Sequence, residues 1–75
     1  MKLDRNTKRS LKVGDVLRFS DSEQYEIVRI FRHIDANINA TNLTLKRGDG
    51  SMIYYVPSSC FYGGEIIRRP LCNPN

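Results

Sequence analysis

The sequence predicts an all-β domain of five short strands around one small core. Three observations support this prediction. The chain has 75 residues, which is enough for one small domain and no more. Its apolar segments are short and rich in Val, Ile, Tyr and Phe, the residues that favour strands. Polar or glycine-containing turns separate these segments.

The first two strands are predicted over residues 16–19 and 25–34, with a polar loop over residues 20–23 between them. The Gly14-Asp15 pair before the first strand is a turn or bulge signal. Residues 25–34 carry apolar groups on both faces, which is typical of a strongly bent strand that serves two parts of a small core. A helix is the competing interpretation, but β-branched and aromatic residues dominate this segment and it lacks a capping pattern.

The second half of the chain predicts three more strands. Residues 35–37 form a turn, and Gly48-Asp49-Gly50 closes a tight hairpin because glycine accepts positive φ. Pro57 ends a strand and begins one tight helical turn. The predicted elements are strands over 38–47, 52–56 and 65–69, with the helical turn over 57–61. This order is the layout of a five-stranded SH3-like (Sm-like) barrel with one short helical turn before the last strand.

The predicted core contains the apolar residues of these strands. It consists of Val16, Leu17, Phe19, Ile27, Val28, Ile30, Leu43, Leu45, Ile53, Val56 and Ile66. The domain therefore spans residues 13–69, and the proline-containing residues 70–75 are expected to fray.

The whole net charge of +4 lies in residues 1–12, and the rest of the chain is neutral. The cations of this segment are Lys2, Arg5, Lys8, Arg9 and Lys12. Because the segment contains few apolar groups, we expect a mobile or loosely docked basic arm. Such an arm suits the phosphates of DNA or RNA, or it only keeps a neutral domain soluble. Deleting residues 1–12 is expected to weaken polyanion binding and leave the barrel folded.

Aromatic and basic residues alternate along the strands, as they do in proteins that stack single-stranded bases on a sheet. Strand alternation places Tyr54 and Tyr55 on opposite faces, so one of them is expected to be exposed. The leading hypothesis is a nucleic-acid-binding module without enzymatic activity. Its predicted contact residues are Lys2, Arg5, Lys8, Arg9, Lys12, Tyr54, Tyr55, Tyr62, Arg68 and Arg69.

The alternative hypothesis is a protein-interaction module that binds a protein partner through an aromatic surface or a free strand edge. The neutral domain favours this hypothesis, because a dedicated nucleic-acid binder usually carries a basic stripe on its folded face. Strand edges also suggest a homo-oligomer.

The sequence gives little support for catalysis or for metal binding. His33, Cys60 and Cys72 are the only soft ligands, fewer than the four of a structural zinc site. No cofactor is expected. No apolar run approaches the roughly 20 residues of a membrane helix, and no signal peptide is visible, so we expect a cytoplasmic protein without membrane contact.

Residues 44–58 resemble the middle β-domain of the small-conductance mechanosensitive channels. The shared pattern is a Thr-x-x-Arg strand at Thr44, an Asp-Gly turn at Asp49, an apolar strand and a corner at Pro57. The resemblance covers about residues 10–70 and implies an Sm-like barrel and assembly through strand edges. Ser58 stands where that family has Asn, and no membrane helix precedes the barrel, so channel function is not implied.

Overall fold

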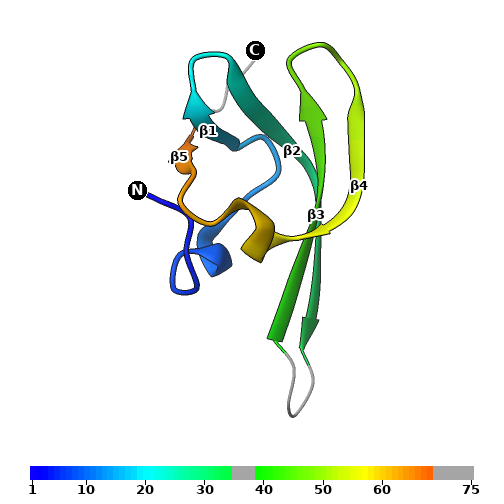
Figure 1. The fold of residues 1–75 in the computed structure, drawn as a ribbon. Coiled ribbons are helices and arrows are strands. Elements are labelled where there is room, and N and C mark those ends of the chain that lie inside the picture. Colours follow the sequence, from blue (N-terminus) through cyan, green and yellow to red (C-terminus); the bar gives the residue numbers. More distant parts are fainter. Residues whose placement is uncertain (35–38, 69–75) are drawn as a thin grey trace, which may run out of the picture.

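The computed structural model describes residues 1–34 and 39–68, and its architecture is mostly β (Figure 1). Each strand is antiparallel to its neighbours, and the sheet order is β4-β3-β2-β1-β5. A short 3₁₀ helix, η2, precedes the last strand as predicted. The elements are η1 (Lys8–Ser10), β1 (Val16–Ser20), β2 (Glu23–Ile34), β3 (Asn39–Arg47), β4 (Met52–Pro57), η2 (Ser58–Phe61) and β5 (Glu65–Ile67).

The five strands occur where the sequence predicts them, with small differences at their ends. Strand β2 begins at Glu23, so the turn before it is shorter than the predicted loop. Strand β5 ends at Ile67. The β3–β4 hairpin turns at Gly50, whose φ of 91° only glycine adopts without strain. The predicted turn over 35–37, Arg69 and the predicted tail over 70–75 lie outside the described residues.

The sheet is not closed in the part of the chain that the structure describes. Strands β4 and β5 stand at its two ends and do not pair with each other. The chain's own N-terminus covers the outer edge of β5. The Leu3 N–H donates to the Gly64 carbonyl at 2.7 Å, and the Ile66 N–H donates to the Met1 carbonyl at 2.8 Å. Between these bonds, Lys2 and Glu65 form an antiparallel backbone β-bridge. The antiparallel sheet is confirmed, whereas closure into a barrel is not.

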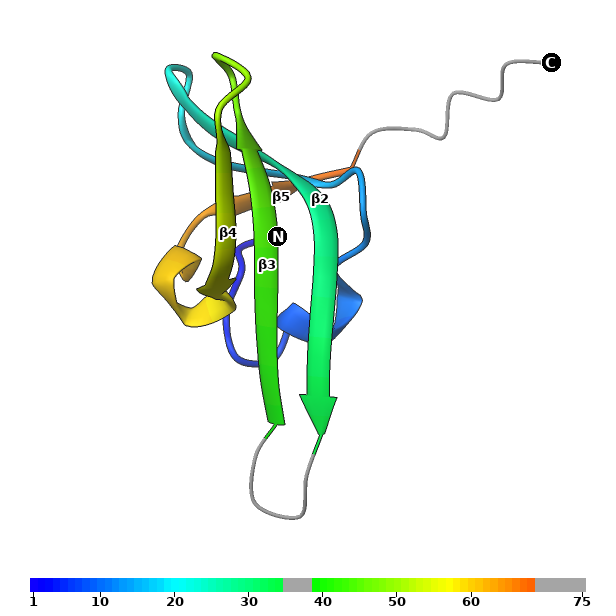
Figure 2. The ribbon, with the colours of Figure 1, turned by 90° about the vertical axis from the view of Figure 1, so that its right-hand side faces the viewer.

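Register shifts bend the long strands, as Figure 2 shows for β2. Ile27 pairs with Leu45 and Arg29 with Thr44, so Val28 is an extra residue on β2. This bulge reverses the inward side of the strand, and both Ile27 and Ile30 therefore pack against the core. The predicted bend of residues 25–34 is confirmed, and the bulge explains their mixed pattern.

The core lies on one side of this bent sheet and is partly as predicted. The prediction that Phe19 and Val28 belong to the core is wrong. Phe19 is 41% exposed and Val28 is only half-buried, because each is the extra residue of a bulge. The Phe19 ring instead packs beside Tyr25 and Phe61, with centroid distances of 6.1 and 6.2 Å. Ile30, Ile53 and Val56 are partly buried. The buried hydrophobic residues are Leu3, Leu11, Val16, Leu17, Ile27, Leu43, Leu45 and Ile66, and all except Val16 form one packed cluster.

Residues 1–12 are docked on the domain, which corrects the expectation of a mobile or loosely docked arm. Leu3 is 0% exposed and Leu11 2% exposed, and both belong to the core. Between them the Asp4 carboxylate accepts hydrogen bonds from the Thr7 N–H at 2.9 Å and the Asn6 N–H at 2.7 Å. The two buried leucines, this local turn and the backbone pairing with residues 63–66 order a segment that is otherwise polar.

Candidate nucleic-acid interface

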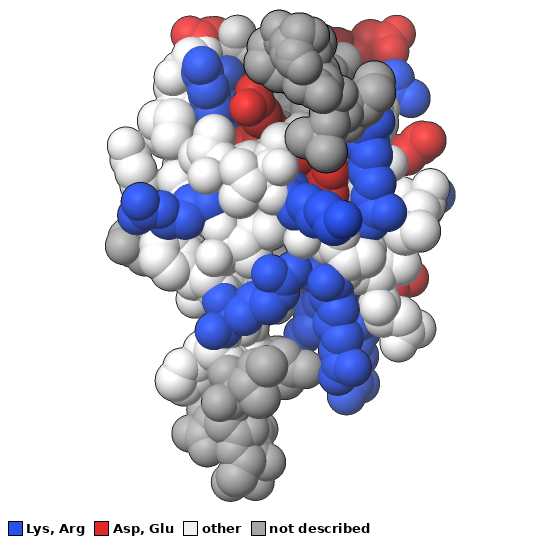
Figure 3. All heavy atoms as spheres, turned by 180° about the vertical axis from the view of Figure 1, so that it is seen from behind, with Lys and Arg blue, Asp and Glu red and all other residues white. Residues whose placement is uncertain are grey.

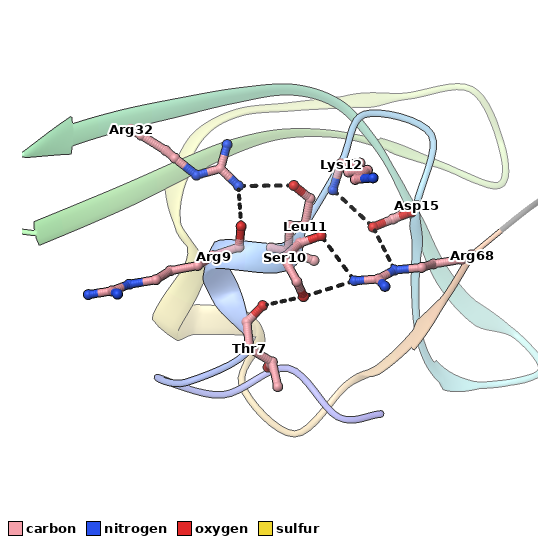
Figure 4. Close-up of polar contacts among 8 residues, drawn as sticks. All are labelled: Thr7, Arg9, Ser10, Leu11, Lys12, Asp15, Arg32 and Arg68. Carbon is pink, nitrogen blue, oxygen red and sulfur yellow. Dashed lines mark hydrogen bonds and ion pairs between the residues drawn. The ribbon is translucent and has the colours of Figure 1, made fainter.

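Two arginines from distant parts of the chain bind the carbonyl groups at the end of η1 (Figure 4). The Arg32 Nη2 atom, from β2, donates to the carbonyl oxygens of Arg9 at 3.2 Å and Leu11 at 2.9 Å. The Arg68 Nη2 atom donates to the Ser10 carbonyl at 3.0 Å and to Ser10 Oγ at 2.8 Å. The last carbonyls of a helix lack partners within it and carry partial negative charge, so cations stabilise this end.

Asp15 contacts both Arg68 and the backbone of the segment that carries η1. Its Oδ2 atom lies 3.7 Å from Arg68 Nε and accepts a hydrogen bond from the Lys12 N–H at 2.9 Å. The Asp15 residue is buried, whereas Arg68 remains exposed. Ser10 Oγ also donates to the Thr7 carbonyl, so the hydroxyl links the start of η1 to Arg68. Residues 7–12 are thereby tied to β2 and to the residue that follows β5.

This docking brings arm cations beside Arg32 of β2 and Arg68, which follows β5. We call Arg9, Lys12, Arg32 and Arg68 the arm surface, and all four residues are exposed. Figure 3 shows Lys and Arg side chains gathered across the face on which η1 and the second half of β2 lie. The positive charge that the sequence assigns to a separate arm is therefore part of a folded surface.

The other predicted contact residues lie in several places. Lys2 and Arg5 are exposed, Lys8 is half-buried in η1, and Tyr62 is exposed after η2, next to the pairing of Gly63 with Leu3. Arg69 and the side chain of Tyr55 lie outside what the structure describes. Tyr54 is 64% exposed, as expected of one member of this pair.

Tyr54 and the arm surface lie on opposite faces of the sheet. Tyr54 lines an open hollow of about 360 Å³ with Val28, Arg29, Thr44 and Met52. Thr44 alternates with Leu43 and Leu45, which point into the core, so the hollow is on the face away from the core. The segment that carries η1 packs on the core side. The structure thus does not bring Tyr54, one of the predicted stacking tyrosines, to the predicted phosphate contacts.

Arg32, which binds the carbonyls at the end of η1, is not among the contact residues predicted from the sequence. Without knowledge of the bulge at Val28, simple alternation does not show on which side of the sheet each residue of β2 lies. After the bulge, Arg32 shares the inward side with Ile30 and reaches η1. The apolar residues on both faces of residues 25–34 are the signal in the sequence, because a shift of register within the strand produces such a pattern.

The arm surface offers positive charge and hydrogen-bond donors. Over residues 1–34 and 39–68, no three His, Cys, Asp or Glu side chains come together as a metal would require. Cys60 is a free, exposed thiol. None of the helices in those residues has the length and apolar character to cross a membrane.

Comparisons with protein-family models, with curated proteins and with solved structures find no match to this chain. The resemblance to the mechanosensitive-channel β-domain therefore stays a hypothesis from the sequence. The geometry of the arm surface is the basis for a proposal about function.

Proposed function

We propose that the protein is a non-enzymatic nucleic-acid-binding module whose arm surface contacts phosphates. One observation carries this proposal: the docking of residues 1–12 places Arg9 and Lys12 beside Arg32 and Arg68 on one exposed surface. Phosphates attract such clusters of Arg and Lys, and contacts to phosphate position a protein on DNA or RNA without reading the sequence.

The ordered docking of residues 1–12 favours their binding to nucleic-acid phosphates. A mobile basic tail loses conformational freedom when it binds, whereas the cations of a docked segment are already positioned. Some N–H groups of Arg32 and Arg68 already donate to the carbonyls at the end of η1, and Arg68 also pairs with Asp15. We therefore assign most of the direct phosphate contact to Arg9 and Lys12, with Lys2, Arg5 and Lys8 adding charge, and we assign positioning to Arg32 and Arg68.

The test is a titration of labelled single- and double-stranded oligonucleotides at two salt concentrations. If the five cations of residues 1–12 neutralise five phosphates of duplex DNA, the slope of log K against log salt is about −4 to −5. The double variant Arg9→Gln/Lys12→Gln removes two charges at exposed side chains, and the slope should fall in magnitude by about 2. Deleting residues 1–12 is unsuitable, because it removes Leu3 and Leu11 from the core.

Lys46→Gln/Arg47→Gln is the matched control, because it removes the same charge at two exposed positions of the β3–β4 hairpin. It should lower the slope much less than the arm variant. Absence of binding by the full chain at low salt, or equal effects of the two variants, would remove the proposal.

The second candidate function is a protein-interaction module, and the hollow on the outer face of the sheet favours it. This hollow exposes Tyr54 beside Met52 and Val28, side chains that suit a protein partner better than phosphate. A stoichiometric protein that co-purifies with the chain after nuclease treatment, and is lost in Tyr54→Ser, selects this function.

We also propose the SH3-like (Sm-like) layout and a cytoplasmic location for the protein. Five strands in this order, with η2 between β4 and β5, support the layout. A crystal structure in which β4 and β5 lie too far apart to close a barrel would contradict it.

A further inference from the structure

Strand β4 presents an open edge at one end of the sheet (Figure 1). Among the described residues its only strand neighbour is β3. The opposite edge differs, because Met1, Lys2 and Leu3 pair alongside β5 and cover it. An open edge exposes a row of backbone N–H and C=O groups that can pair with another strand.

The sequence of this edge lacks the charged residues that commonly protect such strands. Residues 52–56 read Met-Ile-Tyr-Tyr-Val, without one Lys, Arg, Asp or Glu, and Pro57 stands only at the end. A bulge interrupts the pairing with β3 between Ile53 and Val56, so the segment available for a new partner is short. The exposed side chains of Met52 and Tyr54 add apolar surface to this edge.

We propose that two copies of the chain associate through β4, in an antiparallel pairing about a twofold axis. An uncharged strand places no like charges opposite each other when it meets its own copy. The cover on β5 prevents β4 of one copy from pairing with β5 of the next, which would give an open array or a ring. The twofold contact between two β4 strands closes on itself and leaves no further edge.

The pairing has a consequence that rests on the proposed function. Figure 2 shows η1 and the second half of β2, which carry Arg9 and Arg32 of the arm surface, on the side of the molecule away from β4. The dimer would carry two arm surfaces, and binding of a long polyanion by both would strengthen the attachment without a new kind of contact.

Sedimentation velocity of the full chain over about 10 to about 500 µM tests the pairing, because a dimer forms with concentration. The expected result is a rise in mass from 8.7 kDa toward twice that value. Tyr54→Lys introduces a charge at the edge on a largely exposed side chain and should raise the dimer dissociation constant at least about tenfold. Tyr62→Lys, an exposed tyrosine outside β4, is the control and should leave the constant unchanged.

Hydrogen exchange of the unmodified chain gives a second measurement that needs no variant. Amides of residues 52–56 should become more protected as concentration rises, while those of β5 should not change. A chain that stays monomeric across the range overturns the proposal. A dimer that Tyr54→Lys leaves intact, or a concentration-dependent protection outside β4, overturns it as well.

Discussion

Truncating Leu11 to alanine tests whether residues 1–12 are an integral part of the fold. The Leu11 side chain is 2% exposed and packs in the core, while its backbone carbonyl receives Arg32. Leu→Ala at a buried site removes the transfer free energy of the side chain and leaves a cavity, at a cost of about 2–5 kcal/mol. A domain of this length has a total stability of about 4–11 kcal/mol. The variant should therefore lose a large fraction of its free energy of unfolding.

Urea denaturation followed by far-UV circular dichroism measures this loss. Val13→Ala is the control, because it removes a similar amount of apolar side chain two residues further on, at a position that is 63% exposed. The control should change the free energy of unfolding by less than about 0.5 kcal/mol. If Leu11→Ala costs no more than the control, the arm is not docked in solution and the reasoning behind the arm surface fails.

Three further predictions concern the contacts around this segment. Arg68→Met leaves the buried Asp15 carboxylate without its cation. Because the Arg68 side chain is partly exposed, we expect the free energy of unfolding to fall by about 1 kcal/mol in urea denaturation, and no change would mean that the Arg68–Asp15 pair does not stabilise the fold. Gly64→Ala would place a Cβ atom 2.9 Å from Phe19 Cζ, so we expect a loss of about 1–3 kcal/mol, and Phe19→Leu in the same chain should recover part of it. Hydrogen bonds from the Thr7 and Asn6 amides lower the pKa of Asp4, so its contribution to stability is present above its unfolded value of 3.8 and is lost as pH falls below it. Asp4→Ala should therefore lose less stability than the unmodified chain between pH 5 and pH 2.5, and an equal loss in thermal melts at those two pH values would contradict this.

The strands and the helical turn were predictable because their signals are local. Residues such as those of β2 favour strands through their β-branched and aromatic side chains, and Pro57 ends β4 where the sequence predicts. The bend of β2 was predictable too, since apolar residues on both faces require a shift of register. The extra residue, Val28, was not, because an alternating pattern does not say which residue is left unpaired.

The candidate site was predicted only in part, because it depends on contacts between distant segments. Leu3 and Leu11 are two apolar residues in a basic segment, and nothing local shows that both reach the core. Arg32 and Arg68 meet η1 across long stretches of chain, so no motif spacing reveals these two contacts, although Arg68 itself is among the predicted contact residues. Charge pointed to Arg9 and Lys12, which are exposed and whose contact with nucleic acid stays a prediction. The exposed Tyr54 lies on the other face of the sheet.

The most direct test of the nucleic-acid interface is a map of backbone amide shifts in NMR spectra as a short DNA duplex is added at low salt. If the arm surface contacts phosphates, the largest shifts lie in residues 8–12 and at Arg32 and Arg68, and they vanish as salt is raised. Arg9→Gln/Lys12→Gln should reduce them without changing the spectrum of the free core. Shifts confined to β4 and Tyr54, or no shifts at any duplex concentration, would contradict the assignment of the arm surface.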